Sequence, residues 1–123
     1  YSSFYIPGYF YGADMDSRIF SKQHGGGIAL LRQSEIVYLQ VNDKYINIYT
    51  DTNKYYVRSS LNECMRKLEK NFIRISRNVV VNFDNAVCVQ DGEVIVNNGD
   101  KLSVSRRRWK EVKMAYMVYL SEK

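Results

Sequence analysis

Two turn dipeptides near the C-terminal end constrain the fold of this chain most tightly. Asp91-Gly92 and Asn98-Gly99 separate three short apolar runs. Such dipeptides are preferred in two-residue hairpins, because type I′ turns need a positive φ at both central positions. The sequence therefore predicts an antiparallel meander of three strands over residues 86–104.

Further short strands are expected upstream of the meander. Over 45–49, Tyr and Asn alternate with Ile46 and Ile48, so one face of that strand is apolar. Other runs rich in Ile, Val, Tyr and Phe are bounded by turn residues, which is typical of strands. The predicted strands cover residues 18–22, 28–31, 35–41, 45–49, 54–57, 72–75 and 79–82.

Two helices are expected among and after these strands. Residues 59–71 begin with a capping box and carry an apolar stripe at helical spacing, and Asn71 is expected to end that helix. Residues 105–120 repeat aromatic and apolar residues at helical spacing, which predicts a C-terminal helix with Ser105 as its cap.

The length of 123 residues allows one domain with a tail. Residues 1–17 hold the single proline and four of the eleven tyrosines without periodicity, so we expect a linker or tail there and one domain over 18–123. Because the chain begins with Tyr1, we expect it to be a piece of a longer protein. No apolar run approaches the roughly 20 residues of a membrane span, so we expect no membrane contact.

The net charge of +5 is concentrated in one segment. Residues 101–113 hold six basic residues against Glu111 alone, which equals the whole excess. Arg106, Arg107 and Arg108 open the predicted helix, although the helix dipole disfavours cations there. Arginine can grip guanine O6 and N7 with two hydrogen bonds. This pattern favours an anionic partner, while a solvated helix face explains the composition equally well.

No catalytic or metal-binding pattern is present. The sequence has one histidine, His24, and two separated cysteines, Cys64 and Cys88, which we interpret as small core residues. The Gly-rich turn at 24–27 is not accompanied by a nucleophile elbow. We therefore expect no enzyme activity, no cofactor and no metal, and a reducing compartment.

Three segments resemble the LytTR type of DNA-binding domain. Residues 35–50 (EIVYLQVNDKYINIYT) are similar to the opening strand pair of that family. Residues 72–82 (FIRISRNVVVN) are similar to its FxRIHRSxxVN segment, and residues 98–107 (NGDKLSVSRR) to its NGxxLxVSRR segment. The segments occur in family order and spacing, and the resemblance covers residues 18–115.

The resemblance implies a mainly β fold of stacked antiparallel sheets, a β-β-β sandwich, with one short internal helix and a C-terminal helix. It implies a cytoplasmic domain for transcription regulation that binds double-stranded DNA by sequence. Loops of such domains enter successive major grooves, with one domain per direct repeat, and we expect a homodimer on DNA. Such domains form the output half of response regulators in bacterial two-component systems, so a receiver or other signalling domain is expected upstream.

The DNA-facing residues implied by the resemblance fall in three segments. We expect Arg77 and Arg106 to contact base edges, whereas Lys44, Arg107 and Arg108 hold phosphates. Ser76, Asn78 and Arg108 depart from the family pattern, so the preferred DNA sequence is not implied. The full set is Asn42, Asp43, Lys44 and Tyr45, then Arg77 and Asn78, then Arg106, Arg107 and Arg108.

Two other functions remain open. One is a protein-interaction or dimerisation module that has lost DNA binding. The other is a single-stranded nucleic-acid binder with Tyr45, Tyr55 or Tyr56 as stacking aromatics. Three residues also have structural interpretations: Arg74 in packing or an ion pair, Tyr45 as a strand aromatic, and Asn82 as a turn former.

Overall fold

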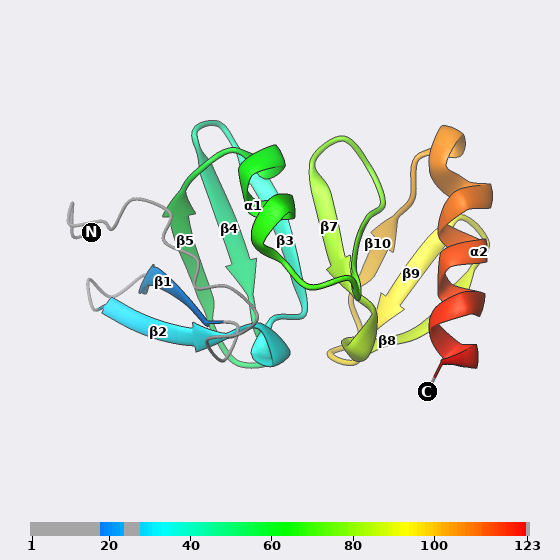
Figure 1. Cartoon of the computed structure of the whole chain (residues 1–123), viewed down its shortest axis with the longest axis horizontal. Coiled ribbons are helices and arrows are strands. Elements are labelled where there is room, and N and C mark those ends of the chain that lie inside the picture. The colour runs from blue at the N-terminus through cyan, green and yellow to red at the C-terminus, as the bar shows by residue number, and fades with distance from the viewer. Residues whose placement is uncertain (1–17, 24–27, 123) are drawn as a thin grey trace.

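The computed structural model describes residues 18–23 and 28–122 (Figure 1). The predicted tail at 1–17, the turn at 24–27 and Lys123 lie outside the described residues. The predicted class is confirmed, because the structure has antiparallel sheets, one short internal α-helix and a C-terminal helix. The elements are β1 (Arg18–Gln23), β2 (Ile28–Arg32), η2 (Gln33–Glu35), β3 (Tyr38–Asn42), β4 (Tyr45–Tyr49), β5 (Lys54–Arg58), α1 (Leu61–Lys67), β6 (Phe72–Arg74), β7 (Val79–Asn82), η3 (Phe83–Asn85), β8 (Ala86–Gln90), β9 (Glu93–Val96), β10 (Lys101–Ser103) and α2 (Arg106–Ser121).

The strands form two sheets. The larger sheet has seven strands in the order β2-β1-β5-β4-β3-β7-β6, and the smaller has three in the order β10-β9-β8. The smaller sheet is the predicted meander, which is confirmed. Strand β3 pairs antiparallel with β4 on one edge and with β7 on the other. It therefore lies inside the larger sheet, and no edge of it is open to solvent.

Strands β3 and β7 are buried on both faces at Tyr38 and Leu39 and at Val80 and Val81. Successive residues of a strand point to opposite faces, so Val80 enters one core and Val81 the other. The first core lies between the larger sheet and α1, and the second joins the opposite face to the smaller sheet and α2. The first core contains Leu31, Ile36, Leu39, Ile46, Ile48, Tyr55, Val57, Leu61, Cys64, Phe72 and Val80; the second contains Val37, Tyr38, Ile75, Val81, Phe83, Val94, Val96, Val104 and Val112.

Helix α1 begins as predicted and ends early. The Ser60 hydroxyl accepts a hydrogen bond from the Glu63 N–H at 3.1 Å, which is one of the two bonds of the predicted capping box. The Glu63 carboxylate accepts from the Ser59 hydroxyl at 3.3 Å. The predicted end at Asn71 is wrong, since the helix stops at Lys67. The buried Gln33 side chain donates to the Lys67 carbonyl at 3.2 Å and accepts from the Glu69 N–H at 2.9 Å. A tertiary contact therefore takes the backbone groups that another helical turn would have used.

The two turn dipeptides of the meander differ. Asp91 and Gly92 have φ values of 54° and 77°, so both central positions of that turn are left-handed as predicted. The type I′ prediction is wrong at Asn98-Gly99, where only Gly99 has a positive φ, of 94°. Its N–H donates to the Val96 carbonyl at 2.9 Å, within the connection between β9 and β10. The strand pairing survives because Gly99 supplies the one left-handed residue that such a loop needs.

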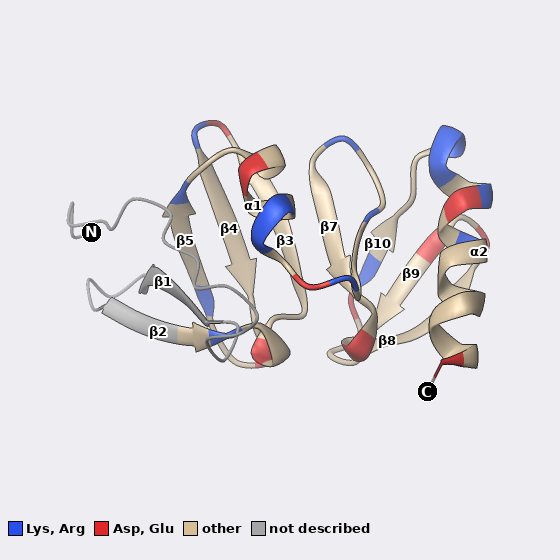
Figure 2. Cartoon of the chain, in the orientation of Figure 1, with Lys and Arg blue, Asp and Glu red and all other residues tan. Residues whose placement is uncertain are grey.

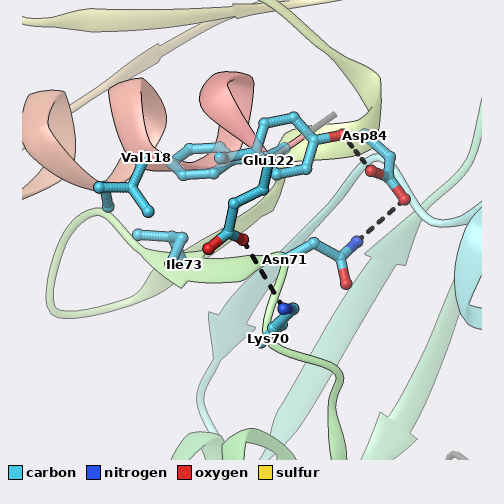
Figure 3. Close-up of a pocket in the computed structure, with 9 residues that line it drawn as sticks. Lys70, Asn71, Ile73, Asp84, Val118 and Glu122 are labelled. Atoms are coloured by element: carbon cyan, nitrogen blue, oxygen red, sulfur yellow. Dashed lines mark hydrogen bonds and ion pairs between the residues drawn. The ribbon is translucent and has the colours of Figure 1, made fainter.

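Helix α2 packs its aromatic side against the second core. Val112 is buried, and Phe83 contacts the Tyr116 ring at a centroid distance of 5.0 Å. Near its C-terminal end, Tyr119 hydrogen-bonds Asp84, and Glu122 lies 3.7 Å from the Lys70 ammonium (Figure 3). These contacts hold α2 against β6 and the segment before it. Neither α1 nor α2 is long and apolar enough to cross a membrane.

Replacing either of two adjacent valines tests the burial of β7 on both faces. Val80 and Val81 are both 0% exposed, so Val80→Ala and Val81→Ala should each lower the free energy of unfolding by about 2 kcal/mol. Val87→Ala is the matched control, because Val87 is 64% exposed on a strand and the change should stay within about 0.5 kcal/mol. Urea denaturation measures all three. A Val81→Ala variant as stable as Val87→Ala would contradict the second core.

The thiol of Cys64 should be unreactive in the folded protein. Burial raises the pKa of Cys64 to about 12, so the nucleophilic thiolate is scarce near neutral pH. In a Cys88→Ser background, iodoacetamide at about pH 8, near the pKa of a free thiol, should leave the native protein unmodified and label it in urea. Mass spectrometry of the product measures this. Equal labelling in both conditions would show that Cys64 is not a core residue.

Candidate nucleic-acid interface

The turn between β3 and β4 supplies the first predicted segment. Asn42, Asp43 and Lys44 are exposed, and Asp43 has a φ of 59°. Tyr45 opens β4 and is half-buried, with its ring edge against Tyr56 at a centroid distance of 5.2 Å. The turn thus presents a lysine and an asparagine, while the tyrosine ring lies on the sheet.

The loop between β6 and β7 supplies the second segment, with Arg77 and Asn78 exposed. The Ile75 and Ser76 N–H groups both donate to the Val79 carbonyl, at 3.0 and 3.4 Å, so the loop is narrow. The Val41 N–H donates to the Asn78 carbonyl at 2.8 Å. That bond places this loop directly beside the end of β3, and so beside the first segment.

The start of α2 supplies the third segment. Arg106 and Arg107 are exposed, and Arg108 is half-buried. The Ser105 N–H donates to the Ile75 carbonyl at 2.9 Å, which fixes the helix start against the base of the second loop. The predicted cap is only partly correct: Ser105 occupies the N-cap position, but its hydroxyl is buried with no hydrogen-bond partner among the described residues.

These three segments share one edge of the molecule, which we call the loop edge (residues 42–45, 75–78 and 105–108). Figure 1 shows them at the same end of the central strands, and Figure 2 shows Lys or Arg in each of them. Within the described residues, the side chains of Lys44, Arg77, Arg106 and Arg107 form no hydrogen bond or ion pair. Their charges are therefore available to an anionic partner.

A polar depression of about 440 Å³ lies between β3, the β6–β7 loop and β10. Gln40, Lys101 and Ser103 line it and are exposed, and sequence reasoning missed all three as site residues. Lys101 lies within the basic segment that the distribution of charge identifies. For Gln40 and Ser103, the only sequence signal was a polar residue in a predicted strand. That signal does not identify a site, because polar residues face solvent in most antiparallel sheets.

Tyr38 lines the same depression with its hydroxyl kept protonated. Burial, more than the nearby carboxylate of Asp100, raises the pKa of Tyr38 to about 12. The hydroxyl lies 3.4 Å from Asp100 Oδ2, and the ring stacks on Tyr49 at a centroid distance of 4.3 Å. The Tyr38 hydroxyl is thus neutral, and its one proton is directed at Asp100.

Asn82 and Arg74 have structural roles. Asn82 is fully buried, donates to the Ile36 carbonyl at 2.8 Å and accepts from the Asp84 N–H at 3.0 Å, which confirms it as a turn former. Arg74 is half-buried and hydrogen-bonds uncharged groups, rather than a carboxylate. In the described part of the chain, no three His, Cys, Asp or Glu side chains cluster as metal ligands would.

Comparison with known proteins gives one consistent result. The model of the LytTr DNA-binding domain family matches residues 26–117. The sensory transduction protein LytT of Bacillus subtilis is 30% identical over 95 residues, which cover 72% of this chain and 39% of LytT. A response regulatory protein of Vibrio cholerae is 38% identical over 63 residues, covering 47% of this chain and 24% of that protein. This chain therefore spans well under half the length of either relative.

A solved structure has the same fold. It is the LytTr DNA-binding domain of a Bacillus cereus protein described as a methyl-accepting/DNA response regulator, with a TM-score of 0.71 and 21% identity. The match covers 80% of this chain and 94% of that domain. At this identity the likeness establishes the fold alone.

The exposed arginines of the loop edge should be dispensable for stability. Arg77→Ala and Arg106→Ala remove side chains without partners among the described residues, so each should change the free energy of unfolding by less than about 0.5 kcal/mol. Urea denaturation of the single variants measures this. A larger destabilisation would show that the arginine supports the fold.

Proposed function

This chain belongs to the LytTr DNA-binding domain family, and we propose that it is the sequence-specific, double-stranded-DNA-binding output domain of a bacterial response regulator. The observation that carries this proposal is the loop edge. Three segments from distant parts of the sequence are tied together by backbone hydrogen bonds and present unpaired cations at one end of the sheet.

The arginines of two loops are assigned to base recognition. Arg77 stands on a narrow loop and Arg106 at the first position of α2, so both project from ordered backbone. A guanidinium pairs with guanine O6 and N7 in the major groove. Asn78, exposed beside Arg77, carries an amide of the type that pairs with adenine.

The other cations are assigned to the DNA backbone. Lys44 is a single charge on a turn, and Arg107 and Arg108 follow Arg106 on the first turn of α2. Phosphate contacts of this kind fix register and affinity without sequence information. Asn42 and Tyr45 flank the first turn and complete the proposed contact set, with the Tyr45 ring packed on Tyr56.

The partners follow from the family and the length of the chain. The matched relatives are a sensory transduction protein and a response regulatory protein, each more than twice as long as the region matched. We therefore expect a receiver or other signalling domain beside this one, in a cytoplasmic regulator. Binding of one domain to each direct repeat, as a homodimer on DNA, belongs to the same proposal.

A protein-interaction module is the second candidate, and one observation favours it. Met114, Met117, Val118 and Leu120 are exposed large apolar residues on the second half of α2. The single-stranded alternative is disfavoured, because stacking needs open ring faces. Tyr55 and Tyr56 are only 8% and 9% exposed, and Tyr45 packs against Tyr56.

Selection from a random double-stranded library at physiological salt tests the proposal. The wild type should enrich a repeated motif, and Arg77→Ala with Arg106→Ala should relax it, because each arginine–guanine pair supplies about 1–3 kcal/mol of discrimination. Lys44→Ala should weaken binding to all sequences and reduce the salt slope of log K by about 0.9. Binding that does not change between low and physiological salt would contradict the proposal.

Lys54→Ala is the matched control for removal of a positive charge. Lys54 is exposed and pairs in register with Tyr49, at the opposite end of β4 from the first turn. Its removal should leave both motif and salt slope unchanged. A folded wild type that enriches nothing would favour the protein-interaction module.

A further inference from the structure

Arg74 is half-buried and uses all three nitrogen atoms of its guanidinium in hydrogen bonds within the protein. Its Nη2 donates to the Arg77 carbonyl at 2.7 Å, and its Nε donates to the Ser76 carbonyl at 3.3 Å. Its Nη1 donates to Asn62 Oδ1 on α1 at 3.2 Å. One side chain therefore connects two consecutive carbonyls of the β6–β7 loop to the helix that covers the first core.

The position of Arg74 in β6 explains how its side chain reaches both the β6–β7 loop and α1. Arg74 follows Phe72 by two residues, so the two side chains share a face of the sheet, and Phe72 packs in the first core beside α1. Arg74 pairs in register with Val80, one residue from the strand end that follows the loop. Its side chain thus lies between the first turn of α1 and the inside of the loop.

The acceptors show that Arg74 acts on the shape of the loop. Loop carbonyls have no partners from a strand ladder, and an unpaired backbone group away from water is costly. The Ser76 and Arg77 carbonyls accept from Arg74, and the Asn78 carbonyl accepts from Val41. The carbonyls of three consecutive residues thus each accept a hydrogen bond from the protein, and the Arg77 side chain remains exposed.

Only arginine fits this arrangement. Its planar guanidinium carries donors in a fixed fork, whereas a lysine ammonium is a point charge on a flexible stem and cannot reach three separated acceptors in one geometry. No carboxylate forms an ion pair with Arg74 within the described residues. Its charge therefore also adds to the positive potential of the loop edge.

We propose that Arg74 is a positioning residue for DNA recognition: it holds the β6–β7 loop in the conformation that presents Arg77 and Asn78, and Asn62 anchors it to α1. The effect of Arg74 on DNA binding rests on the proposed function. The conformation of the loop itself is independent of that function and is measured without DNA.

The test compares Arg74→Lys with Arg66→Lys, a matched change at an exposed arginine of α1. Arg74→Lys should lower affinity for the duplex that the wild type selects by about tenfold, because the loss of charge-assisted hydrogen bonds frees the loop carbonyls. Asn62→Ala should lower it by less, because it removes only the bond to α1 and leaves both bonds to the loop. Affinity for random duplex and the salt slope should not change, because the charge is retained. In an Arg77→Ala background, Arg74→Lys should have a smaller effect than in the wild type, because only the contact of Asn78 then depends on the shape of the loop.

Amide hydrogen exchange of the free protein separates the two proposals. The N–H groups of Ile75, Ser76 and Asn78 should exchange faster in Arg74→Lys than in the wild type or Arg66→Lys, whereas amides of β4, which pairs with β3 and β5, should not. Faster loop exchange in a protein that selects no DNA would overturn the proposed function and leave the loop role intact. Unchanged loop exchange, or wild-type affinity of Arg74→Lys for the selected duplex, would overturn the inference.

A variant Arg74→Met that reduces the salt slope of log K by about 0.9 would show instead that Arg74 contacts a phosphate.

Discussion

The burial of β3 and β7 on both faces is the constraint on which the rest of this structure depends. Leu39 and Val80 need cover from one side, and Tyr38 and Val81 from the other, so α1 and the smaller sheet with α2 must occupy opposite faces. Because β3 and β7 are antiparallel neighbours, the turn after β3 and the loop before β7 emerge at the same end. The start of α2 reaches that end through the bond between Ser105 and Ile75. The two cores and these backbone bonds thus assemble the loop edge.

The loop edge combines ordered backbone with unpaired charge. Its segments are fixed by main-chain hydrogen bonds that the Val41 and Ser105 N–H groups donate and the Val79 carbonyl accepts. The side chain of Arg74 adds further bonds to the β6–β7 loop. Its exposed cations lack carboxylate partners in the part of the chain that the structure describes. Cations without partners repel one another and contribute little to stability, so their placement is explained better by an anionic partner than by folding. A prearranged edge also loses less conformational entropy on binding than a flexible one does.

Much of the fold could be predicted from local sequence, because the strands are short runs rich in β-branched and aromatic residues and the turns between them contain typical turn residues. The meander over residues 86–104 and the start of α1 at Ser60 depend on neighbours in sequence, and both are confirmed. The end of α1 could not be predicted, because it depends on Gln33, which is distant in the sequence. For the site, the basic segments were visible as charge and as a family resemblance. The role of Arg74 could not be predicted, because it depends on contacts with α1 that form only in the folded chain. The depression lined by Gln40 and Lys101 could not be predicted either, because β3, the β6–β7 loop and β10 are distant in the sequence.

The central claim is that the three segments act as one DNA-binding surface, and backbone amide NMR of the domain titrated with a selected duplex tests it most directly. The account predicts that signals from residues 42–45, 75–78 and 105–108 shift together, at the same DNA concentration. Signals from the second half of α2, including Met117 and Leu120, should stay in place. Shifts confined to that half of α2, with an unperturbed loop edge, would contradict the account.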